Sequence, residues 1–340
     1  MTSLMLKEAC SSAEFVTLQI KQESSRFAEL GAQLRAKAPS SVLTIARGSS
    51  DHASAYLAYL IMSRLGRLVT SLPMSLVTLI NAPLEARNAL AIAISQSGQS
   101  PDVIEPIRYF RAGGATTVAL VNDATSPLAT SADWCMPLHA GAEKSVAATK
   151  SFITSLVAGA QLAGHWQNDA DFLAAISALP ESLAAATNLD WTEAIDVLTP
   201  ANNIMVVGRG ISFPIALEAA LKFKETSAIQ AEAFSGAEIK HGPMALIDDG
   251  YPLIIFATRG PTQAGLIALA QDMRERGARV LLAAPADVRE RNLTVPTAAT
   301  PDLDPIVAIQ AFYVMAAKLS LARGLNPDAP RHLSKVTKTN

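Results

Sequence analysis

The chain has 340 residues, half of them hydrophobic, and a net charge of −2, so it can fill two ordinary α/β cores. No basic stripe stands out, which argues against nucleic acid as the main partner. The 2 cysteines, Cys10 and Cys135, are too few for a disulfide framework or a zinc site. The first residues lack the basic and apolar segments of a signal peptide, and apolar stretches such as 156–164 fall short of the ~18 residues of a membrane span. We therefore expect a cytoplasmic protein with no membrane partner.

Strands and helices alternate along the first half of the sequence. Short apolar runs rich in β-branched residues predict buried strands, and apolar residues at helical spacing predict the helices between them. In chain order we expect a helix over 5–38, a strand over 42–46, a helix over 51–65, a strand over 89–94, a helix over 101–112 and a strand over 116–121. This alternation predicts a parallel sheet with helices on both faces.

The same pattern returns in the second half, where strands are predicted over 203–207, 253–257 and 279–283. Glycines beside corresponding strands keep a constant register: 162 positions separate Gly48 from Gly210 and Gly98 from Gly260, and 163 separate Gly114 from Gly277. Chance alignment is the alternative, but three matches at the same structural place favour an internal duplication. We therefore predict two tandem, doubly wound parallel-sheet domains.

This duplication divides the chain into five segments. They are an N-terminal helix over 1–34, a first domain over 35–165, a helical linker over 166–195, a second domain over 196–324 and a tail over 325–340. Open parallel sheets bind ligands beyond the carboxyl ends of their strands. The loops that follow the predicted strands are therefore the first place to look for a binding site.

Hydroxyl groups cluster after two strands of the first domain. They belong to Ser49, Ser50, Ser95, Ser97 and Ser100, with the amide of Gln96 among them. Capping a following helix requires only one such hydroxyl. The excess predicts a phosphate site, since helix N-termini also attract anions. The matching loops of the second half carry arginine, glycine and proline instead, so we expect one phosphate site per chain.

A second polar group lies in the other half. Glu218, Lys222 and Glu225 are spaced to share one helical face, and His241 follows sixteen positions after Glu225. A histidine and a carboxylate together are suited to general acid–base chemistry, although Lys222 and Glu225 alone would also fit a surface ion pair. Glu238 and His241 have the Glu-x-x-His spacing of helical metal sites. That spacing occurs once, with no cysteine or second histidine beside it, so we expect no metal site.

These motifs together resemble a known family. They lie at 47–50, 95–98, 143–151, 221–225 with 231–243, and 330–335. The chain resembles the double sugar-isomerase (SIS) domain proteins and is similar to the isomerase domain of glucosamine-6-phosphate synthase and to SIS-type glucosamine-6-phosphate deaminases. The resemblance covers nearly the whole chain and implies two flavodoxin-like α/β domains.

The resemblance also implies which residues bind the substrate. The phosphate would be held by Ser50, Ser95, Gln96, Ser97 and Ser100. The sugar would be contacted by Ser49, Val146 and Ala147, the last two through backbone groups. The implied partner is a phosphorylated sugar or amino sugar.

Four residues receive catalytic roles from the same resemblance. Glu225 would move a proton between C1 and C2 of the open sugar, and His241 from a neighbouring subunit would open the ring. Lys335 would meet the sugar carbonyl, and Lys222 would be a further lysine of the active site. The resemblance thus implies a homodimer with shared active sites, without a metal or organic cofactor.

The synthase carries a glutaminase domain that this sequence does not match. We therefore expect the same proton shuttle without glutamine, which is deamination of glucosamine 6-phosphate to fructose 6-phosphate and ammonia. A phosphosugar isomerase and a fructosamine-phosphate deglycase are alternatives, because both would use this shuttle. A non-catalytic phosphosugar sensor is an alternative of another class. Such regulators carry a DNA-binding helix-turn-helix, whereas residues 1–40 are expected to form a single helix.

Overall fold

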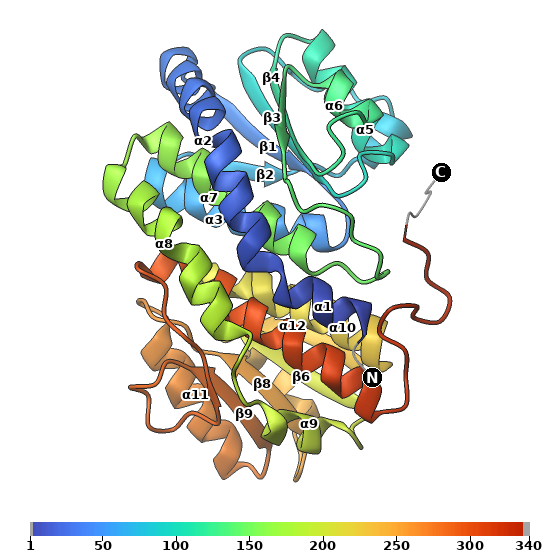
Figure 1. The fold of residues 1–340 in the computed structure, drawn as a ribbon, viewed down its shortest axis with the longest axis vertical. Helices are drawn as coiled ribbons and strands as arrows, with labels where there is room; N and C mark the ends of the chain where they lie inside the picture. Colours follow the sequence, from blue (N-terminus) through green and yellow to red (C-terminus); the bar gives the residue numbers. More distant parts are fainter. Residues whose placement is uncertain (1–2, 336–340) are drawn as a thin grey trace. The chain divides into compact units, whose positions relative to one another are not determined.

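The computed structural model describes residues 3–335, which form two compact units (Figure 1). The first unit contains residues 14–143 and 150–177 together with 334–335. The second unit contains residues 3–13, 144–149 and 178–333. Each unit is built on one five-stranded parallel sheet.

The sheet of the first unit has the order β2-β1-β3-β4-β5, and each neighbouring pair is parallel. Its strands are β1 (Ser41–Ile45), β2 (Val69–Ser71), β3 (Ala89–Ser95), β4 (Thr116–Val121) and β5 (Trp134–Pro137). After β1 the chain adds β2 on one side and β3 on the other. This reversal of direction defines a doubly wound sheet, as the sequence predicts.

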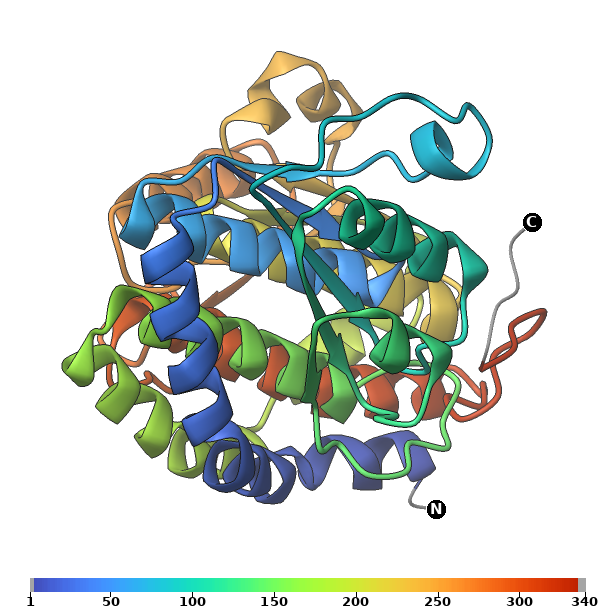
Figure 2. The same ribbon diagram turned by 90° about the horizontal axis from the view of Figure 1, so that it is seen from above.

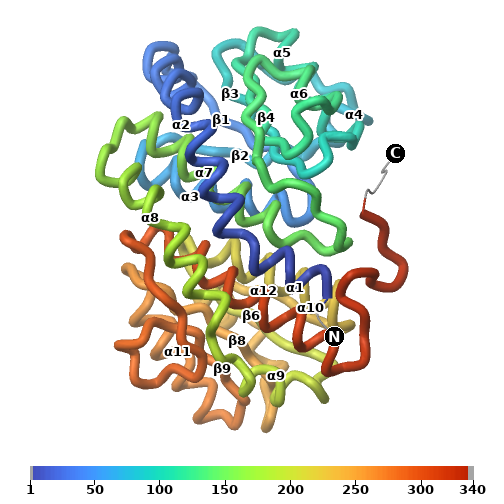
Figure 3. Tube along the Cα trace, viewed as in Figure 1, coloured from blue at the N-terminus to red at the C-terminus, as the bar shows by residue number. Residues whose placement is uncertain are grey.

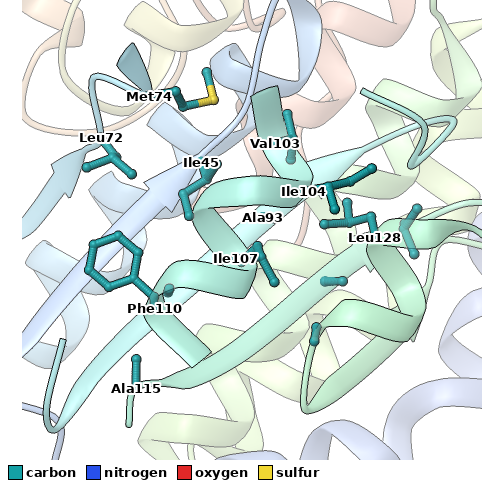
Figure 4. Close-up of a cluster of buried hydrophobic side chains, with 14 of the residues drawn as sticks. Ile45, Leu72, Met74, Ala93, Val103, Ile104, Ile107, Phe110, Ala115 and Leu128 are labelled. Carbon is teal, nitrogen blue, oxygen red and sulfur yellow. The ribbon is translucent and has the colours of Figure 1, made fainter. Parts of the chain in front are cut away.

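Helices cover both faces of this sheet. They are α2 (Ser12–Lys37), α3 (Ser49–Leu65), α4 (Ser75–Thr78), α5 (Pro101–Ala112), α6 (Pro127–Ser131), α7 (Lys150–Gln167) and α8 (Ala170–Ala186), the last continuing into the second unit. On one face, Ile107 and Phe110 of α5 pack with Ile45 and Ala93 of the strands (Figure 4). Figure 2 shows α3 in light blue and α5 in teal on opposite sides of the strands. The central strand β3 is buried almost throughout, which explains its continuous apolar run.

The sheet of the second unit has the order β10-β9-β8-β6-β7, again entirely parallel. Its strands are β6 (Asn203–Gly208), β7 (Gln230–Ser235), β8 (Pro252–Phe256), β9 (Arg279–Ala284) and β10 (Leu293–Thr294). Numbered from the first strand of its own unit, each sheet has the order 2-1-3-4-5, which is the flavodoxin-like order. The shared topology supports the internal duplication inferred from the glycine register.

The helices of the second unit can be followed along the trace in Figure 3. They are α1 (Leu4–Cys10), α9 (Thr192–Leu198), η1 (Gly210–Ser212), α10 (Phe213–Ser227), η2 (Glu238–His241), η3 (Pro243–Leu246), α11 (Gln263–Glu275), η4 (Pro301–Leu303) and α12 (Asp304–Ala322). Within residues 3–335, only the segment Pro301–Ala322 is long and apolar enough to cross a membrane. Its most apolar window is 83% buried inside the fold, and α12 packs against α1, α9 and α10. These contacts are those of a core helix.

The N-terminal helical region differs from the prediction. Two helices, α1 and α2, replace the single helix expected over 5–38, and the break falls at Ser11. The hydroxyls of Ser11 and Ser12 each donate a hydrogen bond of 2.8 Å to a carbonyl three residues back, on Glu8 and Ala9. These bonds compete with continuation of the helical ladder.

Four strands were not predicted from the sequence: β2, β5, β7 and β10. All four lie at the edges of the two sheets. An edge strand pairs on one side only, and β2, for example, has no fully buried residue. Such strands lack the continuous apolar run by which the central strands are recognised.

Candidate functional site

The serine-rich loops lie together at the carboxyl edge of the first sheet. The strands β1 and β3 are parallel neighbours, with Ile45 level with Ala93. The chain leaves them through 46–50 and 95–100, and these two loops lead into the N-termini of α3 and α5. This position is the point where the strand order reverses, and two helix N-termini face it.

The hydroxyls of the second loop shape the loop itself. Ser95 Oγ accepts a hydrogen bond of 3.0 Å from the backbone N–H of Gly98, and Ser97 Oγ accepts one of 3.4 Å from Gln99. Ser100 precedes α5, but its side chain makes no capping bond. A hydroxyl that accepts a bond can still donate one. The half-buried serines of this loop therefore retain donors for an anion.

Gly98 is required by the close packing of this loop. Its φ is +63°, and a Cβ atom at this position would lie 2.2 Å from Ser126 Oγ. The carbonyl of Gly98 accepts a hydrogen bond of 3.2 Å from the N–H of Leu128. The loop is thereby held against the start of α6, and a side chain at position 98 would displace it.

The corresponding loops of the second unit carry arginine and threonine side chains that bond to groups of the same unit. The guanidinium of Arg259 makes two hydrogen bonds to Asp304, of 2.7 and 2.8 Å, and one of 2.6 Å to the carbonyl of Ala298. Thr262 Oγ1 donates to the carbonyl of Arg209 at 3.3 Å. The Arg259 and Thr262 side chains of this edge thus bond to groups of their own unit.

Helix α10 carries three ionisable side chains on one face. Lys222 is 1% exposed, and its Nζ lies 3.4 Å from Glu218 Oε1 and in direct contact with Glu225 Oε2. Tyr313 of α12 donates a hydrogen bond of 2.9 Å to Glu218 Oε1. Burial opposes the charge of Lys222, but the attraction of Glu218 and Glu225 outweighs it and raises the pKa of Lys222. Lys222 therefore holds Glu225 in place as a cation.

Glu225 opens onto a cavity of about 430 Å³. Its side chain is 21% exposed, although its partner Lys222 is buried. The cavity lies between the ends of α10 and α12 and the segment that follows α12. Its lining includes Lys224, Glu225, Asn326, Arg331 and His332. A carboxylate paired with a buried lysine thus borders a cavity large enough for a hexose-sized ligand.

His241 lies on the face of the second unit's sheet that is opposite α10 and α12. Ile239, its neighbour in η2, packs with Leu253 and Ile255 of β8. Phe256, which points to the opposite face of β8, packs on Phe312 of α12, and Phe312 also contacts Phe223 of α10. The sheet therefore stands between η2 and α10. Within one chain His241 and Glu225 therefore lie on opposite faces of the sheet, and His241 is exposed.

Lys335 lies in the first unit beside a buried carboxylate. Its Nζ is 3.0 Å from Glu143 Oε2, and the Glu143 side chain is fully buried. Glu143 also accepts hydrogen bonds from the N–H and hydroxyl of Ser151, of 3.2 and 2.6 Å. These contacts give the tail lysine a defined place at the start of α7.

Val146 and Ala147 belong to a loop that is tied into the second unit. Glu8 of α1 accepts hydrogen bonds from the N–H and the hydroxyl of Ser145. The N–H of Val146 donates to the carbonyl of Asp328 at 3.1 Å. The carboxylate of Asp328 in turn accepts bonds from the first turn of α1. Two segments distant in sequence, α1 and the stretch at Asp328, therefore hold this loop.

Two histidines of the first unit contact polar side chains that lie nearby in space. His139 Nε2 lies 2.7 Å from Glu23 Oε1. His165 contacts Ser24 Oγ at 3.3 Å, and its pKa is lowered by burial and by the nearby charge of Arg35. Among residues 3–335 no group of three or more His, Cys, Asp or Glu side chains is placed to hold a metal ion.

Sequence reasoning did not identify three residues of these surroundings: Glu8, Glu143 and His332. Glu143 stands within a recognised motif, but its partner Lys335 is 192 positions away. Glu8 is likewise far in sequence from Ser145, and His332, which stands within the motif at 330–335, is far in sequence from Glu225. No local spacing could have indicated these pairings.

Comparison with known proteins places these features in a family. A profile of the SIS domain matches residues 36–164 and 197–284. The chain is 33% identical over 312 residues to glutamine–fructose-6-phosphate aminotransferase (isomerizing) of Zymomonas mobilis, a match of 86% of this chain and 51% of that protein. The chain thus spans about half the length of the curated relatives it matches.

Two solved structures share the fold. A candidate phosphosugar isomerase from Silicibacter pomeroyi is 40% identical with a TM-score of 0.91, covering 96% of this chain and 100% of that one. Glucosamine-6-phosphate deaminase from Thermotoga maritima has a TM-score of 0.79 over 99% of this chain and 100% of that one, and at 23% identity it shows the fold alone. The chain therefore belongs to the SIS domain family, with two SIS segments, and is homologous to the isomerase domain of glutamine–fructose-6-phosphate aminotransferase.

Proposed function

We propose that this protein is an enzyme that transfers a proton between C1 and C2 of a phosphorylated sugar, and that its reaction is the deamination of glucosamine 6-phosphate. One observation carries the proposal: the Glu225 carboxylate is held by the buried Lys222 and opens onto a cavity. A carboxylate so placed can act as a base without losing its orientation. A purely sensory protein would have no use for it.

The proposed reaction proceeds in three stages. The serines after β1 and β3 bind the phosphate, with Ser50, Ser95, Gln96, Ser97 and Ser100 as the contacts. Glu225 removes the proton from C2 of the open sugar, giving an enolamine, and returns it to C1. The resulting ketimine at C2 is hydrolysed by water to a ketone and ammonia. The neighbouring carbonyl or imine acidifies the transferred proton, so we propose no metal or organic cofactor.

The remaining residues of the predicted site are proposed to orient the sugar. Lys222 holds Glu225, and Lys335 is proposed to meet the carbonyl at C1. Ser49 and the backbone of Val146 and Ala147 are proposed to contact the sugar hydroxyls. The ties from Glu8 and Asp328 to this loop support such a role, because a fixed backbone positions a ligand better than a free one.

We also propose that His241 opens the ring in the active site of a second copy of the chain. Its exposure and its position on the face opposite α10 support this assignment. A homodimer with shared active sites would bring His241 of one subunit to Glu225 of the other. The proposed partners are thus a phosphorylated amino sugar and a second copy of this chain.

A second candidate is a phosphosugar isomerase acting on sugars without an amine. The Silicibacter pomeroyi structure favours it, since that protein is described as a candidate phosphosugar isomerase and is 40% identical. Both reactions would use Glu225 in the same way. They differ in the group at C2, so only the product separates them.

The test is ammonia release from glucosamine 6-phosphate, without glutamine or added metal. We expect release by the wild-type protein and a loss of roughly 10²- to 10⁴-fold in Glu225→Gln, which keeps the shape but lacks the basic oxygen. Interconversion of aldose and ketose phosphates is measured in parallel. Isomerisation without any release of ammonia would reverse the order of the two candidates.

A further inference from the structure

The cavity at Glu225 contains a histidine that the proposed reaction has not used. Of the residues that line it, four ionise: Lys224, Glu225, Arg331 and His332. Lysine and arginine remain charged at neutral pH, whereas imidazole is the side chain that exchanges a proton between pH 5 and 8. We propose that His332 is a second acid–base residue of this cavity and protonates the amine nitrogen as it leaves C2. This inference rests on the proposed deamination.

The backbone at His332 is held in an unusual conformation. Its φ is +65°, a left-handed value that is uncommon outside glycine and that asparagine, aspartate and histidine adopt more often than other residues. The N–H of Leu333 donates to the carbonyl of Pro330 at 3.4 Å and closes a turn in which His332 is the third residue. Glycine is the residue preferred at such a position. Histidine tolerates this conformation better than most residues, so the turn forms with His332 exposed at its third position.

The turn is also anchored. Pro327 and Pro330 are buried, and the carboxylate of Asp328 accepts hydrogen bonds of 2.9 and 2.7 Å from Leu4 and Met5 of α1. The exposed imidazole of His332 therefore projects from a segment whose preceding residues are fixed. Such support is what a proton donor needs in order to reach one atom of a substrate.

The chemistry requires two groups at the same carbon. In the proposed reaction Glu225 removes the proton from C2, and the amine also leaves from C2. A group that protonates this nitrogen must therefore share the cavity of Glu225. His332 meets this condition within one chain, whereas His241 of the same chain lies beyond the sheet, and the task proposed for His241 of a second copy is ring opening.

The step balances as follows. Water adds to the ketimine carbon and gives a carbinolamine. The C2–N bond then breaks, its electron pair goes to nitrogen, and nitrogen takes a proton from the His332 imidazolium to leave as ammonia. The hydroxyl of the carbinolamine becomes the ketone, and its proton passes to the Glu225 carboxylate. Proton exchange with solvent restores both groups.

The test uses the full-length protein with His332→Asn. Asparagine tolerates a left-handed backbone but does not titrate, so the turn is preserved. The matched control is His139→Asn, since His139 is also left-handed, with φ +52°, and pairs with Glu23 away from the cavity. Two rates are measured from pH 5 to 9 with glucosamine 6-phosphate: ammonia release, and deuterium uptake at C2 of recovered substrate in D₂O.

We expect His332→Asn to lower ammonia release by about 10²-fold or more. Deuterium uptake should stay within a few-fold, because Glu225 is intact. We expect the wild-type rate to decline at alkaline pH, because the proposed donor shares its cavity with Lys224, Glu225 and Arg331 and must carry a proton. This decline should be absent in His332→Asn. The His139→Asn control should keep both rates and the profile.

Release at the wild-type rate with an unchanged pH profile would overturn the assignment. An equal loss of ammonia release and deuterium uptake would overturn it too, since it would indicate a structural role. A wild-type protein that takes up deuterium without releasing ammonia would instead refute the deamination, and the role of His332 with it. The failures of the two proposals are thus distinguishable.

Discussion

The two sheets differ in the side chains that follow their strands, where the first has serine hydroxyls and the second has a paired arginine. In the first unit Ser95 and Ser97 stand where β3 ends, and in the second unit Arg259 is bound to Asp304 at the matching place. An internal duplication that keeps its topology can thus diverge through a few loop side chains. Phosphate binding is the property on which we expect the two edges to differ.

Ser97→Ala should raise KM for phosphorylated substrates by roughly 10- to 100-fold, because a hydrogen bond to a charged group contributes about 1.5–3 kcal/mol. Thr262→Ala is the matched change in the second unit, where Thr262 bonds to a backbone carbonyl. It should change KM little. Steady-state kinetics on both variants provide the measurement, and equal effects would indicate two phosphate sites rather than one.

At the scale of elements, α10 concentrates the buried charge of the second unit. Glu218 is fully buried, and Lys222 Nζ lies 3.4 Å from Glu218 Oε1. The raised pKa of Lys222 means that the folded state holds the proton more tightly than the unfolded chain, whose value is near 10.5. The resulting stabilisation is present below that pH and is lost as the pH rises through the folded pKa.

Lys222→Met should therefore lower the free energy of unfolding by about 3–5 kcal/mol, because it leaves the Glu218 carboxylate buried without the lysine charge that faces it. Adding Glu218→Gln should recover most of this loss, since the uncompensated charge is then absent. Urea denaturation at pH 7 measures both variants. A single variant as stable as the wild type would show that water reaches Glu218 and that the pair contributes little.

At the scale of the whole molecule, we propose that Glu225 of one copy of the chain and His241 of a second copy form one active site. Glu225→Gln and His241→Asn are each expected to be impaired alone. Mixing them in equal amounts should restore up to about a quarter of the wild-type activity, because half of the dimers would be mixed and each would have one intact site.

Subunit exchange must be shown independently, for instance by mass spectrometry of differently tagged chains. Mixing Glu225→Gln with unmodified but heat-inactivated protein provides the background rate. Activity that stays at the level of the separate variants after demonstrated exchange would place both residues in the site of one chain and would contradict the shared-site proposal.

The central strands and the serine loop were predictable from the sequence because their signals are local. The strands β3 and β4 are buried on both faces and so appear as apolar runs. The serines follow the end of such a run directly. Glu218, Lys222 and Glu225 share a face of α10 through helical spacing alone, which the observed ion pairs confirm.

Edge strands and the break at Ser11 escaped prediction for a physical reason. An edge strand such as β7 gains its stability from pairing with β6 as well as from its own burial, and this pairing is not visible in its sequence. At Ser11, hydroxyl bonds to the preceding carbonyls outweigh an otherwise helical pattern. In both cases a contact beyond the local pattern decided the structure.

The sequence by itself determined two doubly wound sheets, the loop with its hydroxyls and the charged face of α10, because each follows from periodicity or from neighbouring residues. Only the tertiary structure decided which distant groups meet. It separated His241 from Glu225 by a sheet, brought His332 to the cavity of Glu225 and paired Lys335 with Glu143. The first outcome depends on which face of the sheet the segments after β6 and β7 cover. The other two depend on where the segment after α12 is anchored. Neither feature can be read from spacings along the chain.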